Sequence, residues 1–192
     1  GPGNSTDEAN AVAVDTNGNV IVTGESGNGA NMDFLTIKYS GTGVPLWTKR
    51  YDGPGNGSDS AVAVVVDGSG NAVVAGRSWN SMGGYYYITI KYSSAGVPLW
   101  TNLYGGGNDL LFAMAQDGSG NVVVTGRSQG GTITWNDYLT IKYSGAGVPL
   151  WTNRYNGPGN GTDDEPYLAV DASGSVIVTG TSPFSTNSAD FV

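Results

Sequence analysis

Short apolar runs separated by turn residues make up the whole chain. In the first fifty residues, runs that fit strands cover 10–15, 20–23, 34–39 and 44–51. Within the third run, Leu35-Thr-Ile-Lys-Tyr39 alternates apolar and polar side chains, which is the period of a strand with one wetter face. Gly, Asn, Asp and Ser fill the connections. The pattern predicts four antiparallel strands joined by hairpin turns.

The same four runs recur with a period of about fifty residues. The string Leu-Thr-Ile-Lys-Tyr-Ser at 35–40 returns at 139–144 and, with one change, at 88–93. Each copy leads into Gly-Val-Pro-Leu-Trp-Thr, and the aspartate that closes the first run is repeated too. These aspartates are Asp15, Asp67, Asp117 and Asp171. Four antiparallel strands in about fifty residues is the size of one propeller blade.

The repeats divide a single domain, residues 1–192, into units of roughly 1–52, 53–104, 105–156 and 157–192. The last unit is truncated, because Asp190-Phe191-Val192 aligns with Asp33-Phe34-Leu35, where the third strand starts. We therefore expect an all-β protein, a β-propeller of four-stranded antiparallel blades, with about four blades and the last one incomplete. An incomplete blade exposes a hydrogen-bonding edge. The chain is then a fragment of a longer propeller, or a partner completes the sheet, or the last blade is simply short.

Composition supports the all-β interpretation and removes several classes of function. The chain has 32 glycines and only 12% charged residues, and the usual helix formers are scarce. A net charge of −8 argues against nucleic acid and anionic membranes as partners. No apolar run approaches the ~20 residues that span a bilayer. The absence of cysteine and histidine excludes disulfides, thiolate chemistry, a triad-type base and imidazole-ligated metals.

Three strings carry a resemblance to a known family: Asp-x-x-Gly-Asn-Val-x-Val-Thr-Gly, Asp-Tyr/Phe-Leu-Thr-Ile-Lys-Tyr and Gly-Val-Pro-Leu-Trp-Thr-x-x-Tyr-x-Gly-Pro-Gly-Asn. Together they resemble the SBBP-type bacterial β-propeller repeat over essentially the whole chain, although Tyr86 stands where Asp33 and Asp137 occur. The resemblance implies a scaffold in exported or surface-attached proteins, so we expect an extracellular or cell-surface location. The chain shows no signal peptide, so an exported protein would be represented by its mature form or an internal piece. The family has no general catalytic motif.

One acidic position recurs just before the first strand of each unit, as Asp7, Asp59, Asp109 and Asp163. In a closed ring these carboxylates would lie at one rim of the central channel, where hard oxygen ligands suit calcium. Alternatively, each carboxylate accepts backbone N–H bonds and orders the glycine-rich loop before it. We expect no cofactor, with calcium at these positions as the alternative.

Bulky aromatic residues gather in the variable connection between the second and third strands. These are Trp79, Tyr85, Tyr86 and Trp135. Aromatic faces flanked by Asn, Ser and Gly suit sugar rings or a protein partner, and loops often carry such contacts. These residues are therefore the predicted ligand-binding surface.

Other repeated positions have simpler interpretations. Lys38, Lys91 and Lys142 lie within strands, and we expect each to pair with an aspartate of the same or the next blade. The repeated tryptophans at the outer strands are expected to pack between blades, and Asp15-Thr-Asn-Gly-Asn19 and its copies to form hairpin turns rather than calcium loops. Three asparagines match the N-glycosylation sequon, which is also a common turn sequence. They are Asn4, Asn56 and Asn160.

The leading functional prediction is a non-catalytic extracellular scaffold that mediates adhesion, protein–protein interaction or self-assembly, and hence not an enzyme. The near identity of the copies suits a multivalent binder, because catalysis usually makes one site differ from the others. Two alternatives stay open: a glycan-binding module using the loop aromatics, and a carbohydrate-active enzyme using the rim carboxylates. The expected partners are a protein or a second copy at the open blade edge, or a glycan, and neither nucleic acid nor an inserted membrane.

Overall fold

The computed structural model describes residues 5–105, 107–129, 135–171, 173–185 and 188–191, and these residues form an all-β structure. Its strands are β1 (Asp7–Val14), β2 (Val20–Gly27), β3 (Met32–Tyr39), β4 (Pro45–Tyr51), β5 (Asp59–Val66), β6 (Ala72–Trp79), β7 (Tyr85–Tyr92), β8 (Pro98–Tyr104), β9 (Leu110–Gln116), β10 (Val122–Gln129), β11 (Asn136–Tyr143), β12 (Pro149–Tyr155), β13 (Asp164–Val170), β14 (Val176–Ser185) and β15 (Ser188–Phe191). None of the described segments is a helix that could cross a membrane.

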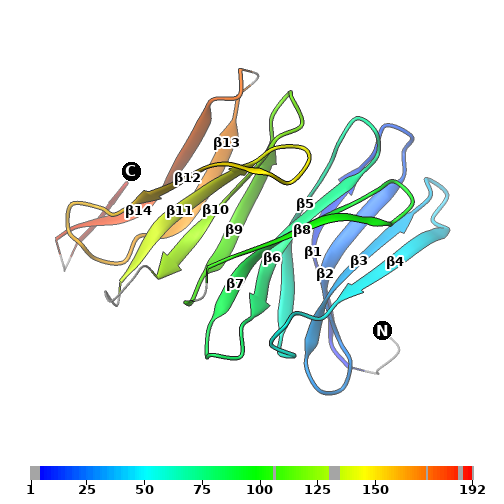
Figure 1. Cartoon of the computed structure of the whole chain (residues 1–192), viewed down its shortest axis with the longest axis horizontal. Helices are drawn as coiled ribbons and strands as arrows, with labels where there is room; N and C mark the ends of the chain where they lie inside the picture. Colours follow the sequence, from blue (N-terminus) through cyan, green and yellow to red (C-terminus); the bar gives the residue numbers. More distant parts are fainter. Residues whose placement is uncertain (1–4, 106, 130–134, 172, 186–187, 192) are drawn as a thin grey trace.

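Each unit forms its own antiparallel sheet with the strands in chain order. The first three sheets have four strands, and the fourth has three, β13-β14-β15. Figure 1 shows the sheets in a row, with the first unit at one end and the fourth at the other. This arrangement of four-stranded blades confirms the all-β propeller architecture with an incomplete last unit.

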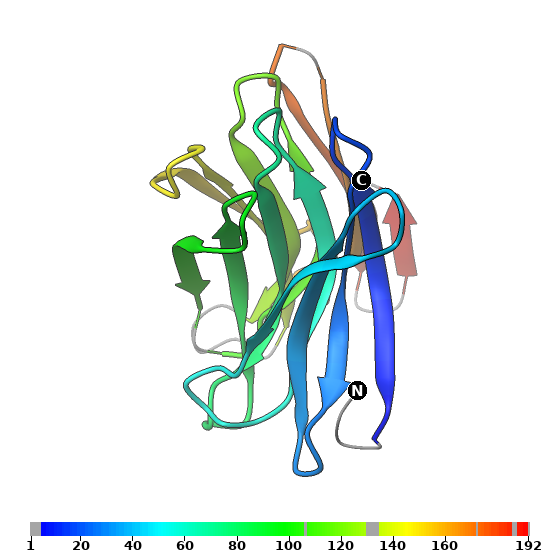
Figure 2. The same cartoon turned by 90° about the vertical axis from the view of Figure 1, so that its right-hand side faces the viewer.

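The first strands of successive sheets contact one another, β1 with β5, β5 with β9 and β9 with β13. They form the inner edge of the row, from which the later strands extend outward. Figure 2 shows the twist of the sheets, since β4 runs obliquely to β1. Twisted sheets whose first strands meet are what a propeller segment requires.

The hydrophobic core lies between neighbouring sheets rather than inside any one of them. At the first junction, Phe34, Trp47 and Tyr51 of the first unit pack against the second unit. The second-unit side of this contact consists of Ala61, Val64, Val74, Ile88, Ile90 and Tyr92. The same positions recur at the second junction, where Trp100 and Tyr104 pack against the third unit. The prediction that the strand tryptophans pack between blades is confirmed at Trp47 and Trp100.

The turns and lysine pairs follow the sequence predictions. Asp15 Oδ1 accepts the backbone N–H groups of Asn17 and Asn19, both at 2.9 Å, and Gly18 takes a positive φ of 77°. Lys38 Nζ lies 2.8 Å from Asp15 Oδ2 and also donates to Gly70 O of the next unit. Equivalent pairs join Lys91 to Asp67 and Lys142 to Asp117. The lysines therefore tie the outer part of each blade to its first turn.

Candidate functional site

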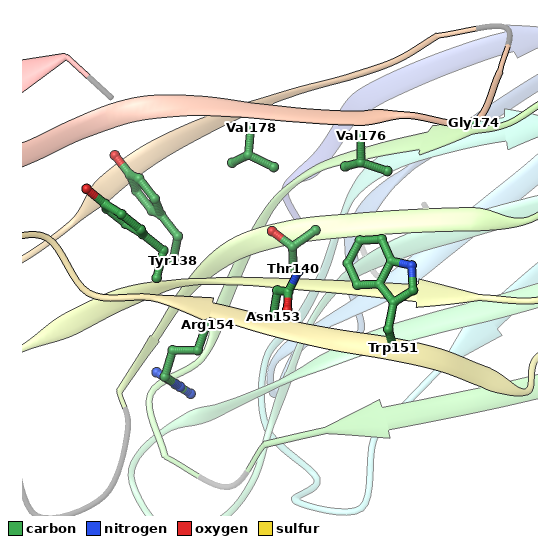
Figure 3. A pocket seen from close by; sticks show the side chains of 9 residues that line it. Tyr138, Thr140, Trp151, Asn153, Arg154, Gly174, Val176 and Val178 are labelled. Atoms are coloured by element: carbon green, nitrogen blue, oxygen red, sulfur yellow. The ribbon is translucent and has the colours of Figure 1, made fainter.

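A groove of 590 Å³ lies between the third and fourth sheets. The third sheet supplies Tyr138, Thr140, Trp151, Asn153, Arg154 and Tyr155, and the fourth supplies Gly174, Val176 and Val178. Figure 3 shows the valines of β14 facing the side chains of β11 and β12 across the groove. The volume falls in the range of small-ligand sites, about 300–1,000 Å³.

The period of the strands places the groove side chains. Tyr138 and Thr140 are two residues apart on β11, and Trp151, Asn153 and Tyr155 are spaced in the same way on β12, so each set shares one face of its strand. The rings of Tyr138 and Tyr155 stack with centroids 5.9 Å apart and planes 19° apart. The indole of Trp151 lies beyond Thr140, toward Val176 (Figure 3). The groove thus has aromatic surface at both ends.

Two hydrogen-bond donors on β12 have no partner within the described part of the chain. At the first two junctions the equivalent tryptophans bind the next unit, since Trp47 Nε1 donates to Ser94 O at 3.1 Å and Trp100 Nε1 to Gly145 O at 3.2 Å. Asn102 Nδ2 likewise donates to Gly147 O at 2.8 Å. The counterparts of these donors in the third unit are Trp151 Nε1 and Asn153 Nδ2, and both residues line the groove.

Charged groups surround the groove but are paired among themselves. Arg154 donates to Ser128 O and lies 3.2 Å from Asp137 Oδ2, and Figure 3 shows its guanidinium directed away from the valines of β14. The Tyr138 hydroxyl donates to Thr181 O. Burial, and then the charges of Asp163 and Asp164, raise the pKa of Tyr138 to about 12, so this phenol is neutral at physiological pH. The groove therefore offers neutral donors and aromatic faces.

The repeated acidic position holds the loops. Asp59, Asp109 and Asp163 are almost fully buried, whereas Asp7 is exposed. Asp59 accepts the backbone N–H groups of Gly53 and Trp79, at 2.6 and 3.0 Å, and Asp163 that of Gly157 at 3.0 Å. These are the contacts that the loop-ordering alternative predicts.

The carboxylates that lie near Asp59 are not the ones at the equivalent positions of the other units. Among the described residues, ligand atoms of Asp33, Asp52 and Asp59 lie within 4.8 Å of one another. Asp33 also pairs with Arg50 at 2.8 Å, which balances part of this negative charge. Burial, and less strongly the charge of Asp52, raise the pKa of Asp59. Asp33 and Asp52 are not members of the recurring acidic position, and calcium binding at Asp7, Asp59, Asp109 and Asp163 stays a prediction.

The predicted aromatic surface is divided between two units. Trp79 and Tyr85 contact each other edge to face with centroids 5.3 Å apart, and Trp79 also lies against Gly55 and Gly57. Tyr86 is half-buried, while Trp135 is exposed on the third unit. Binding at these side chains stays a prediction, because Trp79 already packs on a loop of its own chain.

The remaining predicted positions concern glycosylation. Asn56 and Asn160 are exposed and adopt positive φ values of 47° and 45° in tight turns. This geometry explains their Asn-Gly sequences as turn signals. Asn4 lies outside the described residues. Modification at these asparagines stays a prediction.

The sequence had assigned Trp151 to packing between blades and had not singled out Tyr138 or Asn153. The contacts of the other two tryptophans show what Trp151 lacks. Trp47 and Trp100 bind the turn between the third and fourth strands of the next unit, and no described residue holds Trp151 in the same way. No repeated motif marks a missing contact, so the alignment of the repeats does not single out these residues.

No protein-family model and no curated protein matches the chain, so the SBBP resemblance stays a prediction. Among solved structures, an endo-arabinase from Bacteroides thetaiotaomicron VPI-5482 is similar at 14% identity, with a TM-score of 0.49, over 94% of this chain and 72% of that one. That protein is named as an enzyme, so the expectation that this chain is not an enzyme is corrected and is not maintained.

Proposed function

We propose that the groove between the third and fourth sheets binds a carbohydrate chain. The observation that carries the proposal is the combination, in one groove, of aromatic faces with two donors, Trp151 Nε1 and Asn153 Nδ2, that have no partner among the described residues. Apolar faces of sugar rings pack on aromatic side chains, while their oxygens accept hydrogen bonds. At the equivalent positions Trp47, Trp100 and Asn102 donate to carbonyl oxygens, so oxygen acceptors fit this position.

The charge around the groove favours a neutral saccharide. The protein carries a net charge of −8, which repels acidic polysaccharides over a distance set by the salt concentration. Arg154 is the one cation among the described residues that line the groove, and it is already paired with Asp137. Neutral hexose or pentose polymers therefore suit the site better than uronic acids or sulfated chains.

The test is binding of a panel of neutral and acidic polysaccharides, including arabinan, by affinity electrophoresis and calorimetry. We expect Trp151→Ala and Asn153→Ala to weaken binding of a neutral member about tenfold or more, as for central contacts of a binding site. Leu150→Ala is the matched control, because Leu150 is exposed on the same strand and does not line the groove. Binding that both groove variants leave unchanged, or no binding by any member, would overturn the proposal.

Hydrolysis of the bound saccharide is a second candidate, and one observation favours it. The Tyr138 hydroxyl donates to Asp164 O, next in the chain to Asp163, whose Oδ1 is buried without a hydrogen-bond partner in the described part of the chain. Burial raises the pKa of this carboxyl, as in a general acid. Asp163 is fully buried, so the loop around Gly157 has to open before a substrate reaches it. The same incubations are therefore assayed for new reducing ends, whose appearance distinguishes an enzyme from a binding module.

A further inference from the structure

The face of the first unit that points away from the second unit is largely apolar, and no described part of another unit covers it. It is formed by Ala9, Val12, Val22, Leu35, Ile37 and Tyr39, of which all but Val12 line a shallow hollow. Val12 is 65% exposed. In Figure 1 this sheet lies at one end of the row. We call this surface the leading face.

The equivalent surfaces of the second and third units are interfaces. The residues at the positions of Val22, Leu35, Ile37 and Tyr39 are Val74, Ile88, Ile90 and Tyr92 in the second unit and Val124, Leu139, Ile141 and Tyr143 in the third, and all eight are buried. Val12 corresponds to Val64 in the second unit and to Met114 in the third, and both of these residues pack against the same cores. The leading face therefore has the composition of an interblade surface without its partner blade.

At the other end of the row, the fourth unit has a face that points away from the third unit and that no described residue covers (Figure 1). In the second unit, Val65 and Val73 belong to the core that is shared with the third unit. Their counterparts in the fourth unit, Ala169 and Ile177, are exposed, Ile177 to 58%, and the neighbouring Tyr167 is 69% exposed. We call this surface the trailing face.

We propose that the trailing face of one molecule docks on the leading face of a second copy of this chain, head to tail. The contact continues an interface that the chain already makes between its own units, because near-identical repeats present near-identical surfaces. Such a heterologous contact gives a closed ring if the rotation per unit closes, and a filament if it does not. The inference uses neither the groove nor its ligand, so it is independent of the proposed carbohydrate site.

An ion pair at the junction between the third and fourth units shows how the head-to-tail contact can be strengthened. Arg127 of the third unit forms an ion pair with Asp164 of the fourth. Strand pairing places Thr181 at the position of Arg127, and Glu8 at the position of Asp164. In the head-to-tail contact Thr181 of one copy therefore faces Glu8 of the next. Thr181→Arg would recreate the internal ion pair between molecules.

The contact is expected to be weaker than the internal junctions. The described part of the fourth unit has no fourth strand, so it contributes no counterpart of Trp47 or Trp100. Affinity depends on such central aromatic contacts more than on area. We therefore expect dissociation in the micromolar range, with monomers in dilute solution.

The test is the molar mass of the full chain by light scattering from about 1 µM to about 1 mM, a span that covers micromolar affinities. We expect reversible, concentration-dependent association. Val12→Asp, which puts a charge on the leading face without touching the core, should weaken it at least tenfold. Leu99→Asp is the control, because Leu99 is 52% exposed but lies on neither face.

A charge cycle adds a gain of affinity that nonspecific aggregation would not show. Thr181→Arg should strengthen association about twofold to fivefold, as for an exposed ion pair. Combining it with Glu8→Arg should remove that gain and leave association weaker than in the parent chain. A protein that stays monomeric at the highest concentration, or that associates equally well with Val12→Asp, would sink the proposal.

Discussion

Lys38, Lys91 and Lys142 each reach the aspartate that closes the first strand of their own unit, and each also donates to a backbone carbonyl of the next unit. Each pair is largely buried, so both charges have lost most of their water. The aspartates accept backbone and asparagine N–H groups as well, so the whole turn depends on the carboxylate staying ionised. Each lysine therefore holds a turn of its own unit and a backbone carbonyl of the next unit together.

The pair of Lys142 with Asp117 gives a pH-dependent stability. Burial opposes ionisation, but Lys142, Asn121 and backbone N–H groups outweigh it and lower the pKa of Asp117 to about 2. A carboxyl whose pKa is lower in the folded state stabilises the fold above its unfolded value near 3.8, and this contribution is lost as pH falls toward 2. Lys142→Met should destabilise the protein by about 3 kcal/mol at neutral pH, because Asp117 is left buried without its cation.

The measurement is urea unfolding at several pH values. The destabilisation caused by Lys142→Met should shrink between pH 4 and pH 2, since the uncompensated carboxylate then becomes neutral. Lys49→Met serves as the comparison, because Lys49 forms no ion pair within the described chain. An equal loss of stability in both variants would contradict the ion-pair explanation.

At the scale of the element, the fourth strand of each blade holds the turn between the third and fourth strands of the next one. The ring of Trp47 lies over Gly96, and that of Trp100 over Gly147. Both glycines have positive φ values, 80° and 81°. The first unit carries the same turn with Gly43 at φ 83°, but nothing lies within 4 Å of where its Cβ would be. One turn thus occurs in a covered and an uncovered form within one chain.

This pair of turns separates backbone strain from packing. Gly43→Ala and Gly96→Ala place the same side chain at nearly the same positive φ, which costs about 1–2 kcal/mol in each. Only at Gly96 would the new Cβ lie 2.8 Å from the Trp47 ring. We therefore expect Gly96→Ala to destabilise the protein by about 1–3 kcal/mol more than Gly43→Ala. The readout is the free energy of urea unfolding of each variant at a concentration where the protein is monomeric, and equal losses would show that Trp47 yields freely.

The strands and their order were predictable because alternation, turn residues and the repeat all point to the same blade. The boundaries were less so: β1 begins at Asp7 rather than Asn10, since its polar start pairs with Ser26 on β2. The grouping of Asp33, Asp52 and Asp59 depends on how the connection between blades folds, which no spacing encodes. The groove depends on a contact that is missing at Trp151, and a missing contact has no motif.

At the scale of the whole molecule, the repeat makes each junction a copy of the others, so stability and assembly follow from neighbour contacts. The internal junctions bury the apolar positions of the strands, while the leading and trailing faces present them to solvent. The groove and the two faces have a common origin, since each is a place where an interblade contact is only partly made. The carbohydrate site and the self-association surface are separate consequences of the same repeated design.

Net charge sets how such association should respond to salt. Each copy carries a net charge of −8, so two copies repel one another, and the leading face adds Asp7, Glu8 and Glu25 at its margin. Raising the ionic strength from about 0.01 M to about 0.15 M shortens the screening length from about 30 Å to about 8 Å. The apolar contact is insensitive to this change, so screening should strengthen association of the parent chain.

The gain produced by Thr181→Arg should shrink over the same range, because its ion pair with Glu8 is screened too. Sedimentation equilibrium at both salt concentrations measures association of the parent chain and the gain in association from Thr181→Arg. If association of the parent chain weakens as salt is added, attraction between charges, rather than the apolar faces, holds the copies together.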